Sequence, residues 1–343
     1  MLPGVPRPLS FSFMKTRFAF AGFRHGHVLD LLTGAEERDD TEVVACCEED
    51  AAARESLAAA GRVKNTHTDF ATMLREVECD VVAIGDYYAK RGSLVIAALE
   101  AGKHVLGDKP LCTTLEEQAT IERLASERGL SVFLQLDSRG YGAFLKLREI
   151  IRAGELGDIA TIRIDGQHPL LLGTRPGWYF EPGKHGGTIN DIAIHAFDFV
   201  PWMTGLGWRR IVAARTWNAK PREFPHFNDC AQFLAELDNG AGVTADLSYL
   251  APDKLGYTLP HYWRLTVHGT RGMAETHLLA KEVTVITDSD TAPQQRPAAP
   301  AQTRPYLSDF LHEIRHQPEL AELRTADCLR ASRLALEAEA AAR

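Results

Sequence analysis

The first half of the chain alternates continuous apolar runs with amphipathic stretches. Continuous apolar runs joined by helical crossovers are typical of strands buried on both faces of a parallel sheet. We predict strands at 17–22, 42–47, 80–85, 104–107 and 131–136, with helices at 27–35, 50–61, 90–101 and 114–128. This order predicts an α/β Rossmann domain, a doubly wound parallel sheet, over residues 15–137.

The pattern changes after residue 155, where apolar and polar residues alternate with a period of two between turn signals such as "DNGAG" and "GTRG". The alternating runs lie at 159–166, 209–218, 231–239, 242–250, 262–270 and 282–288. They predict an α+β substrate and oligomerisation domain, residues 138–305, with an open, mostly antiparallel sheet. After a Pro/Ala/Gln-rich loop, "SDTAPQQRPAAPAQTRP", helices at 306–316 and 325–342 form a segment, 306–343, that we expect to pack back on the body.

Composition and net charge limit the kinds of partner that the protein is expected to bind. The chain has 343 residues and a formal net charge of −8, with no basic run, so we expect two domains, no nucleic acid and a small-molecule partner. No apolar run is long enough to cross a bilayer, so we expect no membrane partner. The six cysteines lack C-x-x-C spacing, which favours reduced thiols and a cytoplasmic protein. Residues 1–14 are expected to be a disordered or mis-assigned leader rather than a signal peptide.

The segment "FAFAGFRHGH" occupies the first strand-to-helix turn, where dinucleotide folds carry G-x-G-x-x-G. Gly22 supplies the tight turn, but Arg24 and His27 hold the second and third glycine positions. The helix that follows offers free N–H groups and a positive dipole end to a pyrophosphate. A plain strand–helix turn is the alternative. The residues predicted to bind the cofactor at the ends of the first four strands are Gly22, Phe23, Arg24, His25, Gly26, His27, Glu48, Gly85, Asp86, Tyr87, Asp108 and Lys109.

The second strand ends in three consecutive acids. Glu48 follows His27 by 21 residues, close to the spacing of an acid that binds an adenosine ribose. Together with Glu49 and Asp50 it would repel a 2′-phosphate, so NAD is preferred over NADP. Arg24, in the turn after the first strand, could reach a 2′-phosphate or stack on adenine, so NADP remains the alternative. The alternative is that these acids only favour the N-terminus of the next helix.

Two further stretches carry polar groups where chemistry is expected. Lys109 leaves the fourth strand in "AGKHVLGDKPLCTT" and points toward the crevice at the carboxyl ends of the strands. In "HGGTINDIAIHAFDF", Asp191, His195 and Asp198 share one face of an otherwise apolar helix. The alternatives are a solvated lysine and a buried polar cluster that fixes a domain junction.

The segments "ALEAGKHVLGDKP", "FLKLREIIRAGELGDI", "RPGWYFEPGKHGGTINDIAIHAFDF" and "VHGTRGMAE" together resemble the Gfo/Idh/MocA family, named for glucose–fructose oxidoreductase, inositol dehydrogenase and a rhizopine-catabolism protein. The resemblance extends from Arg17 to the C-terminus. It implies an N-terminal Rossmann domain that binds NAD(P), and oxidation or reduction of a sugar, polyol or related ring at a carbinol carbon.

The family motifs assign the site residues. E-K-P matches Asp108-Lys109-Pro110 with a conservative change, and G-G-x-x-x-D-x-x-x-H-x-x-D matches the segment from Gly186 to Asp198. The resemblance thus implies Lys109, Asp191 and His195 as the catalytic group. The family's T-P-N-x-x-H segment is replaced here by "DYYAKR", residues 86–91.

Alcohol oxidation needs a base beside the hydroxyl, and His195, which titrates near neutral pH, is the candidate. Lys109 would stabilise the alkoxide and oppose protonation of the histidine, and Asp191 would orient the imidazole or bind a substrate hydroxyl. Asp198 is expected to support the helix. The loop before it offers the substrate residues Arg175, Trp178, Tyr179, Lys184 and His185, of which the aromatic ones have packing as the alternative.

His25 and His27 lack further ligands at useful spacing, so we predict no metal. We expect one face of the second sheet to be too apolar for solvent, and hence a homodimer or homotetramer through that sheet.

Two rival functions remain: an NAD-assisted glycosidase that cleaves glycosides without net cofactor reduction, and a non-catalytic nucleotide or sugar sensor. Retention of Lys109, Asp191 and His195 argues against the sensor.

Overall fold

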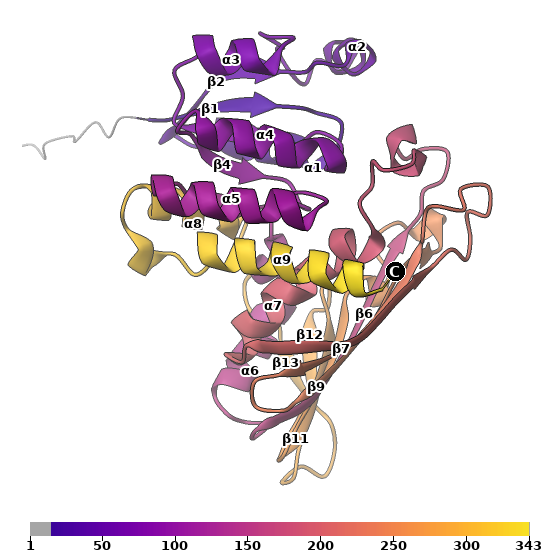
Figure 1. Ribbon diagram of the computed structural model, residues 1–343. Coiled ribbons are helices and arrows are strands. Elements are labelled where there is room, and N and C mark those ends of the chain that lie inside the picture. Colours follow the sequence, from indigo (N-terminus) through magenta and orange to yellow (C-terminus); the bar gives the residue numbers. More distant parts are fainter. Residues whose placement is uncertain (1–14, 343) are drawn as a thin grey trace, which may run out of the picture.

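Two sheets, joined through helices, form the part of the chain that the computed structural model describes, residues 15–342 (Figure 1). The leader predicted over residues 1–14 lies outside the described residues. Within residues 15–342, no helix combines the length and apolar character needed to span a membrane.

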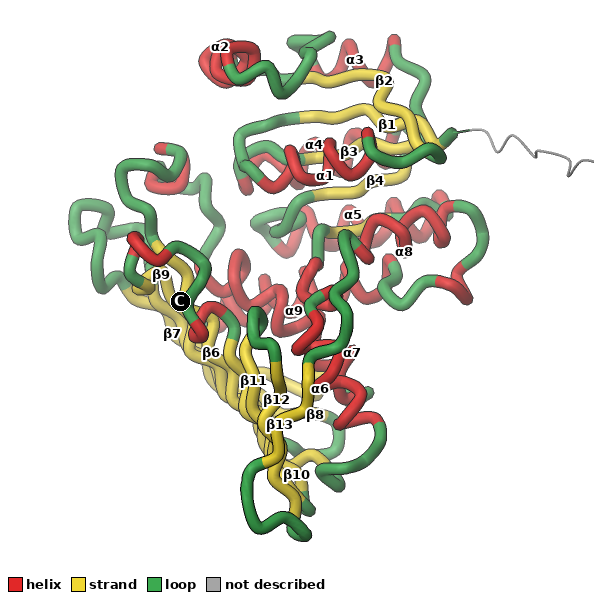
Figure 2. The backbone as a smooth tube through the Cα atoms, turned by 180° about the vertical axis from the view of Figure 1, so that it is seen from behind, coloured by secondary structure: helices red, strands yellow, loops and turns green. Residues whose placement is uncertain are grey.

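The first sheet is parallel, as predicted, with the order β2-β1-β3-β4-β5. Its strands are β1 (Thr16–Ala21), β2 (Thr41–Cys47), β3 (Val81–Ile84), β4 (His104–Gly107) and β5 (Val132–Leu134). The helices are α1 (His27–Glu36), α2 (Ala51–Ala59), α3 (Phe70–Glu76), α4 (Tyr88–Glu100) and α5 (Leu115–Arg128). The central strand β3 and the edge strand β5 are fully buried, because helices cover both faces (Figures 1 and 2). Helix α3 was not predicted from the sequence.

The strand order places a topological switch point beside β1. The chain leaves β1 for β2 on one side and returns to β3 on the other, so a crevice opens at the carboxyl ends of β1 and β3. Gly22 makes the turn after β1 with φ of +78°, and a Cβ there would lie 2.6 Å from Cβ of Asp86. Only glycine fits this close approach without strain.

The second sheet has the order β13-β12-β11-β10-β6-β9-β8-β7 and is mostly antiparallel, as predicted, with β6 and β9 as a parallel pair. Its strands are β6 (Ile159–Pro169), β7 (Trp208–Trp217), β8 (Cys230–Leu237), β9 (Gly242–Ala251), β10 (Arg264–Gly269), β11 (Gly272–His277), β12 (Glu282–Thr287) and β13 (Gln294–Pro297). Strand β13 corrects the prediction of a loop there. It pairs only with β12, and an edge strand tolerates proline because one side needs no donor.

Helices cover only one face of this sheet (Figure 2). Helices α6 (Gly142–Arg152) and α7 (Ile194–Thr204) pack on that face, and α6 was not predicted. The uncovered face is mostly polar, with single exposed apolar side chains such as Leu234, which corrects our expectation of an apolar face. Gln167 and Gln232 both donate to Asp246 there, and Arg264 pairs with Glu275 at 2.7 Å. The argument for an oligomer from the sequence relied on an apolar sheet face, and that argument no longer holds.

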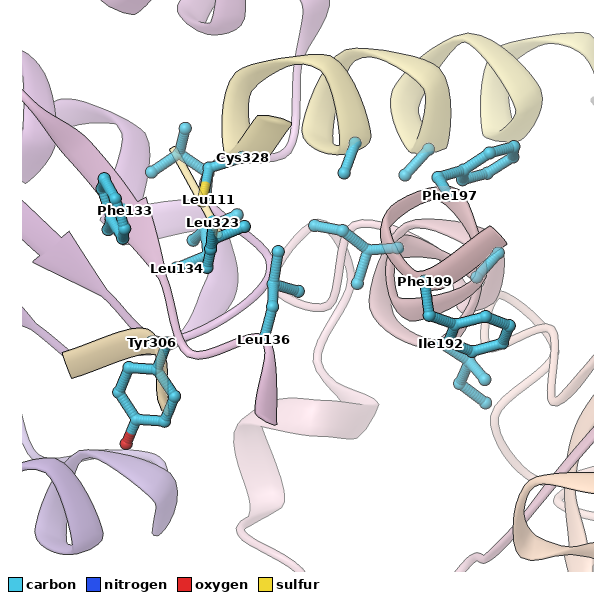
Figure 3. Packing of buried hydrophobic residues seen from close by; sticks show 14 of the residues in the cluster. Leu111, Phe133, Leu134, Leu136, Ile192, Phe197, Phe199, Tyr306, Leu323 and Cys328 are labelled. Carbon is cyan, nitrogen blue, oxygen red and sulfur yellow. The ribbon is translucent and has the colours of Figure 1, made fainter. Parts of the chain in front are cut away.

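The last helices, α8 (Pro305–Ile314) and α9 (Thr325–Ala341), return to the first sheet. Phe310 of α8 contacts the rings of Phe18 and Phe133, and α9 lies between α5 and α7 (Figure 1). Figure 3 shows Cys328 of α9 near Leu134 on one side, with Phe197 and Phe199 of α7 on the other. One apolar core therefore continues from the parallel sheet to α7, which holds the two sheets in a fixed relation.

A candidate active site between the two sheets

A cleft of about 490 Å³ opens where the carboxyl edge of the parallel sheet meets the second sheet. Its volume lies in the range of ordinary small-molecule sites, about 300–1,000 Å³. Residues from both halves of the chain line it: His25, His27, Asp30, Lys109, Gln135, Asp137, Tyr141, His168, Arg175, Tyr179, Asp191, His195, Tyr249, Tyr257, Thr258, Tyr262, Leu279 and Tyr306. The structure thus brings the predicted Lys109, Asp191 and His195 together in one cleft.

Asp191 and His195 are presented by an irregular helix. A π-helical turn, Ile189–Ala193, precedes α7 and carries Asp191, and such turns are frequent at functional sites. Glu339 of α9 accepts a 2.9 Å hydrogen bond from the backbone N–H of Ile189, and a Cβ on Gly187 would lie 2.1 Å from its carboxyl carbon. The last helix therefore fixes the start of this turn. Sequence reasoning missed Glu339 because no local pattern connects it to Ile189.

Lys109 and Asp191 form a buried ion pair. Lys109 Nζ donates to Asp191 Oδ1 at 2.6 Å and to the Asp191 carbonyl at 3.0 Å. The second carboxylate oxygen accepts the hydroxyl of Tyr249, which also contacts His185 Nε2 at 3.1 Å. Gly187 N–H donates to His185 Nδ1, so the ring proton sits on Nε2. Nε2 therefore donates to the Tyr249 hydroxyl, which in turn donates to Asp191. We call Lys109, Asp191, His195 and Tyr249, with His185 behind Tyr249, the catalytic wall, after the role that the family motifs imply for Lys109, Asp191 and His195.

The charges of this wall are fixed rather than titratable near neutrality. Burial opposes ionisation of Asp191, but the Lys109 ammonium group holds the pKa of Asp191 well below its ordinary value. Burial, reinforced by the charge of Lys109, holds the pKa of His195 well below its usual range. This corrects the expectation that His195 titrates near neutral pH. The imidazole is neutral there and can accept a proton.

His195 keeps one nitrogen open to the cleft. Ser138 Oγ lies 3.5 Å from Nδ1, whereas Nε2 has no hydrogen-bond partner among residues 15–342. Asp198, one turn further on, does not reach the cleft, because Arg139 donates to both of its oxygens at 2.5–3.1 Å. This agrees with the supporting place predicted for Asp198.

The turn after β1 places two imidazoles beside the end of β4. Nδ1 of His25 lies 2.5 Å, and Nδ1 of His27 3.1 Å, from the carboxylate of Asp108. The reason given for excluding a metal, that no third ligand is near, is therefore wrong. Arg91 Nη2 also donates to Asp108, at 2.7 Å, so the buried carboxylate already has a positive partner, and we keep the prediction of no metal. Arg91 comes from the replaced "DYYAKR" segment, in which Tyr88 bonds the Tyr179 hydroxyl.

Two of the acids after β2, Glu48 and Asp50, have different roles. Glu48 accepts the backbone N–H of Phe23 at 2.6 Å and that of Asp50 at 2.9 Å, so it braces the turn after β1. Each carboxylate oxygen keeps a second lone pair for a ribose hydroxyl. Asp50 caps α2 by accepting the N–H of Ala53, which is the alternative considered for these acids. It also pairs with Arg24 at 3.2 Å.

The residues around the turn fit a dinucleotide. Helix α1 begins after Gly26 with no side-chain cap, and a Cβ on Gly26 would meet nothing within 4 Å. Open space before an uncapped helix N-terminus suits a pyrophosphate group. Gly85 is needed for close packing, since a Cβ there would lie 2.3 Å from Val28. Asp86 and Tyr87 stand at the same sheet edge, and burial raises the pKa of Asp86 to about 6.

The predicted substrate loop divides into two groups. Arg175 and Tyr179 line the cleft, whereas Trp178, Lys184 and His185 do not. Trp178 is 2% exposed and donates its ring N–H to the Arg24 carbonyl, so it packs the loop against the turn after β1. Lys184 pairs with Glu181, and His185 lies behind Tyr249.

Sequence reasoning missed the tyrosines that line the cleft, with the exception of Tyr179. Six of the eight tyrosines line the cleft: Tyr141, Tyr179, Tyr249, Tyr257, Tyr262 and Tyr306. His168 at the end of β6 was also missed, as was Asp137 after β5. The spacing of Tyr257 and Tyr262 in an irregular loop gave no periodic signal. We call Arg175, Tyr179, Tyr257 and Tyr262 the tyrosine wall.

Comparison with known proteins agrees with this architecture. Residues 17–136 match the family model described as "Oxidoreductase family, NAD-binding Rossmann fold", and residues 144–275 match the GFO/IDH/MocA C-terminal domain. The chain belongs to the GFO/IDH/MocA oxidoreductase family. This confirms the resemblance drawn from the motifs, and with it an NAD-binding Rossmann domain.

Relatives of this GFO/IDH/MocA protein include dehydrogenases. The scyllo-inositol 2-dehydrogenase (NADP(+)) IolW of Bacillus subtilis is 29% identical over 44% of this chain and 43% of that protein. The D-xylose dehydrogenase of Paenarthrobacter nicotinovorans is 26% identical over 54% of this chain and 51% of that protein. The chain thus matches about half the length of these relatives. An oxidoreductase from Erwinia carotovora atroseptica SCRI1043 has a similar structure, with a TM-score of 0.85 and 25% identity over 96% of this chain and 99% of that one.

Proposed function

We propose that this GFO/IDH/MocA protein is an NAD(P)-dependent dehydrogenase that acts on a carbinol carbon of a sugar, inositol or related polyol. The observation that carries the proposal is the ion pair of Lys109 and Asp191 in the cleft that His195 also lines, at the carboxyl edge of the nucleotide-type sheet. A base, a cation and an orienting carboxylate are the groups that alcohol oxidation requires.

The proposed chemistry divides among three side chains. His195, neutral and open at Nε2, takes the proton of the substrate hydroxyl. The Lys109 ammonium group stabilises the negative charge that develops on that oxygen. Asp191, held ionised by Lys109 and Tyr249, fixes the ammonium group and accepts a substrate hydroxyl. Bound NAD(P) would supply the hydride acceptor.

We propose NAD as the preferred cofactor. The Arg24 guanidinium is already paired with Asp50, and if the adenosine ribose binds beside Glu48, a 2′-phosphate would be repelled by the acids after β2. The name of the B. subtilis relative specifies NADP(+), so the two cofactors have to be compared directly. A tenfold or greater advantage in kcat/KM for NADP would contradict this preference.

The tyrosines support a polyhydroxylated substrate. Tyrosine offers an apolar face for ring C–H groups and a hydroxyl that exchanges hydrogen bonds with substrate hydroxyls. Relatives are named as inositol and D-xylose dehydrogenases, and a similar structure from Azotobacter vinelandii, 18% identical with a TM-score of 0.75, is a complex with NADH and myo-inositol.

We also retain the proposal of a cytoplasmic homodimer or homotetramer. All six cysteine thiols are buried and free, which suits a reducing compartment. On β7 to β9, Val212, Leu234 and Leu250 are 40–47% exposed and offer apolar contacts on a mostly polar surface. A monomer in sedimentation at micromolar concentration would contradict this assembly.

The test is a screen of sugars, inositols and sugar alcohols with NAD and NADP, following the absorbance of reduced nicotinamide. We expect stoichiometric formation of the reduced cofactor with at least one polyol, and its loss in His195→Gln. Cleavage of a glycoside without net reduction would favour the glycosidase. Nucleotide binding without turnover on any substrate would favour the sensor.

A further inference from the structure

Arg175 is the second fixed positive charge in the cleft. It lies in the loop between β6 and α7, and its guanidinium stacks over the rings of Tyr179 and Tyr249, with centroid distances of 4.5 and 5.4 Å. Nε donates to the Leu170 carbonyl at 2.8 Å, and Nη2 donates to the Pro169 carbonyl at 2.9 Å. These bonds fix the direction of the guanidinium without neutralising it.

The charge of Arg175 has no counter-ion among residues 15–342. Within residues 15–342 it forms no ion pair, whereas Lys109, in the same cleft, is neutralised by Asp191 at 2.6 Å. The ionisable side chains around it are chiefly tyrosines, namely Tyr179, Tyr249, Tyr257 and Tyr88. An arginine this enclosed is normally paired, because removing its charge from water is costly.

Asp137, also in the cleft, does not supply the missing charge. It forms no ion pair with Arg175 among the described residues, and the charges that act on it most are those of His27 and Lys109. Asp137 therefore leaves the charge of Arg175 uncompensated among residues 15–342.

The guanidinium also has unused donors. Of its five N–H groups, one on Nε and up to two on Nη2 are engaged, the last by a 3.3 Å contact with the Tyr257 hydroxyl. Nη1 has no hydrogen-bond partner in the described part of the chain, so both of its N–H groups are available to a ligand. The Tyr257 hydroxyl stands beside them as a further donor.

We infer that Arg175 binds a carboxylate of the substrate, so that the polyol oxidised here is a sugar acid, such as an aldonate or a uronate. This inference rests on the proposed function and specifies its substrate class. The two Nη1 donors and the Tyr257 hydroxyl match the two oxygens of one carboxylate. A phosphate dianion has three oxygens and a second charge, and needs more cations than this end of the cleft supplies. The hydroxyl to be oxidised would lie at the catalytic wall, and the acid at the tyrosine wall.

The experiment compares substrates that differ only in the acid. We would measure kcat/KM with NAD for two pairs of substrates, D-gluconate with D-glucitol and D-galacturonate with D-galactose. Glucose 6-phosphate tests whether the site prefers a phosphate to a carboxylate. We expect the acid to be preferred at least tenfold in one pair. Preference for the neutral members or for the phosphate would overturn the inference.

Variants separate binding from loop stability. Arg175→Gln should lower kcat/KM for the acid by about 10- to 100-fold, mainly through KM, and change the neutral partner less than threefold, as loss of a charge-assisted bond predicts. Arg175→Lys keeps the charge and should retain part of the preference if Arg175→Gln does not fold. The control is Arg222→Gln, an exposed arginine outside the cleft. Equal losses for acid and neutral substrates in Arg175→Gln would overturn the inference.

Failure of the redox proposal would be recognised separately. If no compound yields reduced cofactor, the shift of the melting temperature by gluconate and by glucitol is measured in the presence of NAD. A shift specific to gluconate that is lost in Arg175→Gln would support the carboxylate site while the dehydrogenase proposal fails. The absence of such a shift would overturn the site as well.

Discussion

The two walls of the cleft differ in how far their polar groups are already paired. In the catalytic wall, Lys109, Asp191, Tyr249 and His185 bond to one another, and only Nε2 of His195 is left open. In the tyrosine wall, Arg175 keeps a charge and two donors unused. Side chains that already bond to one another keep their geometry before substrate arrives. A group with unused donors and an unpaired charge gains more interaction energy when substrate binds. The first arrangement suits chemistry and the second suits recognition.

Breaking the pair at the centre of the catalytic wall should have the largest effect. Lys109→Met leaves Asp191 as an unpaired buried charge, which typically costs about 3–5 kcal/mol of unfolding free energy. Urea denaturation measures this loss, and the double variant with Asp191→Asn should recover most of it. Lys146→Met, which removes an exposed pair with Glu149, should cost less than about 1 kcal/mol. Equal costs at both lysines would contradict the conclusion that the Lys109–Asp191 pair is a buried pair on which stability depends.

Removing the one open group of the catalytic wall should affect rate but not stability. His195→Gln deletes the proposed base, and loss of a general base usually lowers turnover by about 100-fold or more. NAD affinity and melting temperature should stay close to those of wild type. The exposed His268→Gln is the control. Wild-type turnover in His195→Gln would refute the role of the imidazole.

The buried histidines should make the cleft sensitive to acid. Burial lowers the pKa of His168 to about 3, while in the unfolded chain a histidine takes up its proton near pH 6.5. Between these values the unfolded state binds more protons, so stability falls as the pH falls below 6.5. At pH 5 this one group costs about 2 kcal/mol relative to pH 7.5. His168→Gln should reduce the pH-dependent loss by that amount in urea titrations at the two pH values, and an unchanged loss would contradict the shift.

The smallest effect is expected in the tyrosine wall. Tyr257 is 39% exposed and its hydroxyl makes a 3.3 Å contact with Arg175. Tyr257→Phe should change the unfolding free energy by less than about 0.5 kcal/mol. It should raise KM for an acid substrate a few-fold with kcat unchanged. A large loss of stability would show that this wall is as tightly coupled as the other.

The sequence predicted what depends on local periodicity and on motif. The continuous apolar runs predicted the parallel sheet, with Lys109 at the carboxyl edge of its strands. The family motifs grouped Lys109 with Asp191 and His195, and the structure places all three in one cleft. It could not predict that burial would take the pKa of His195 away from neutrality, since that depends on groups distant in sequence. In the tyrosine wall, Arg175 and Tyr179 were predicted from the loop before the catalytic helix, whereas Tyr257 and Tyr262 were missed because they lie in an irregular loop. Strand β13 was missed because its register comes from a neighbour and not from its own composition.

The bond between Glu339 and the backbone of Ile189 spans 150 residues of sequence. It makes helix α9 a support of the backbone turn that carries Asp191. Removal of this carboxylate, for example in Glu339→Ala, would therefore disturb the candidate site from a helix that does not line the cleft.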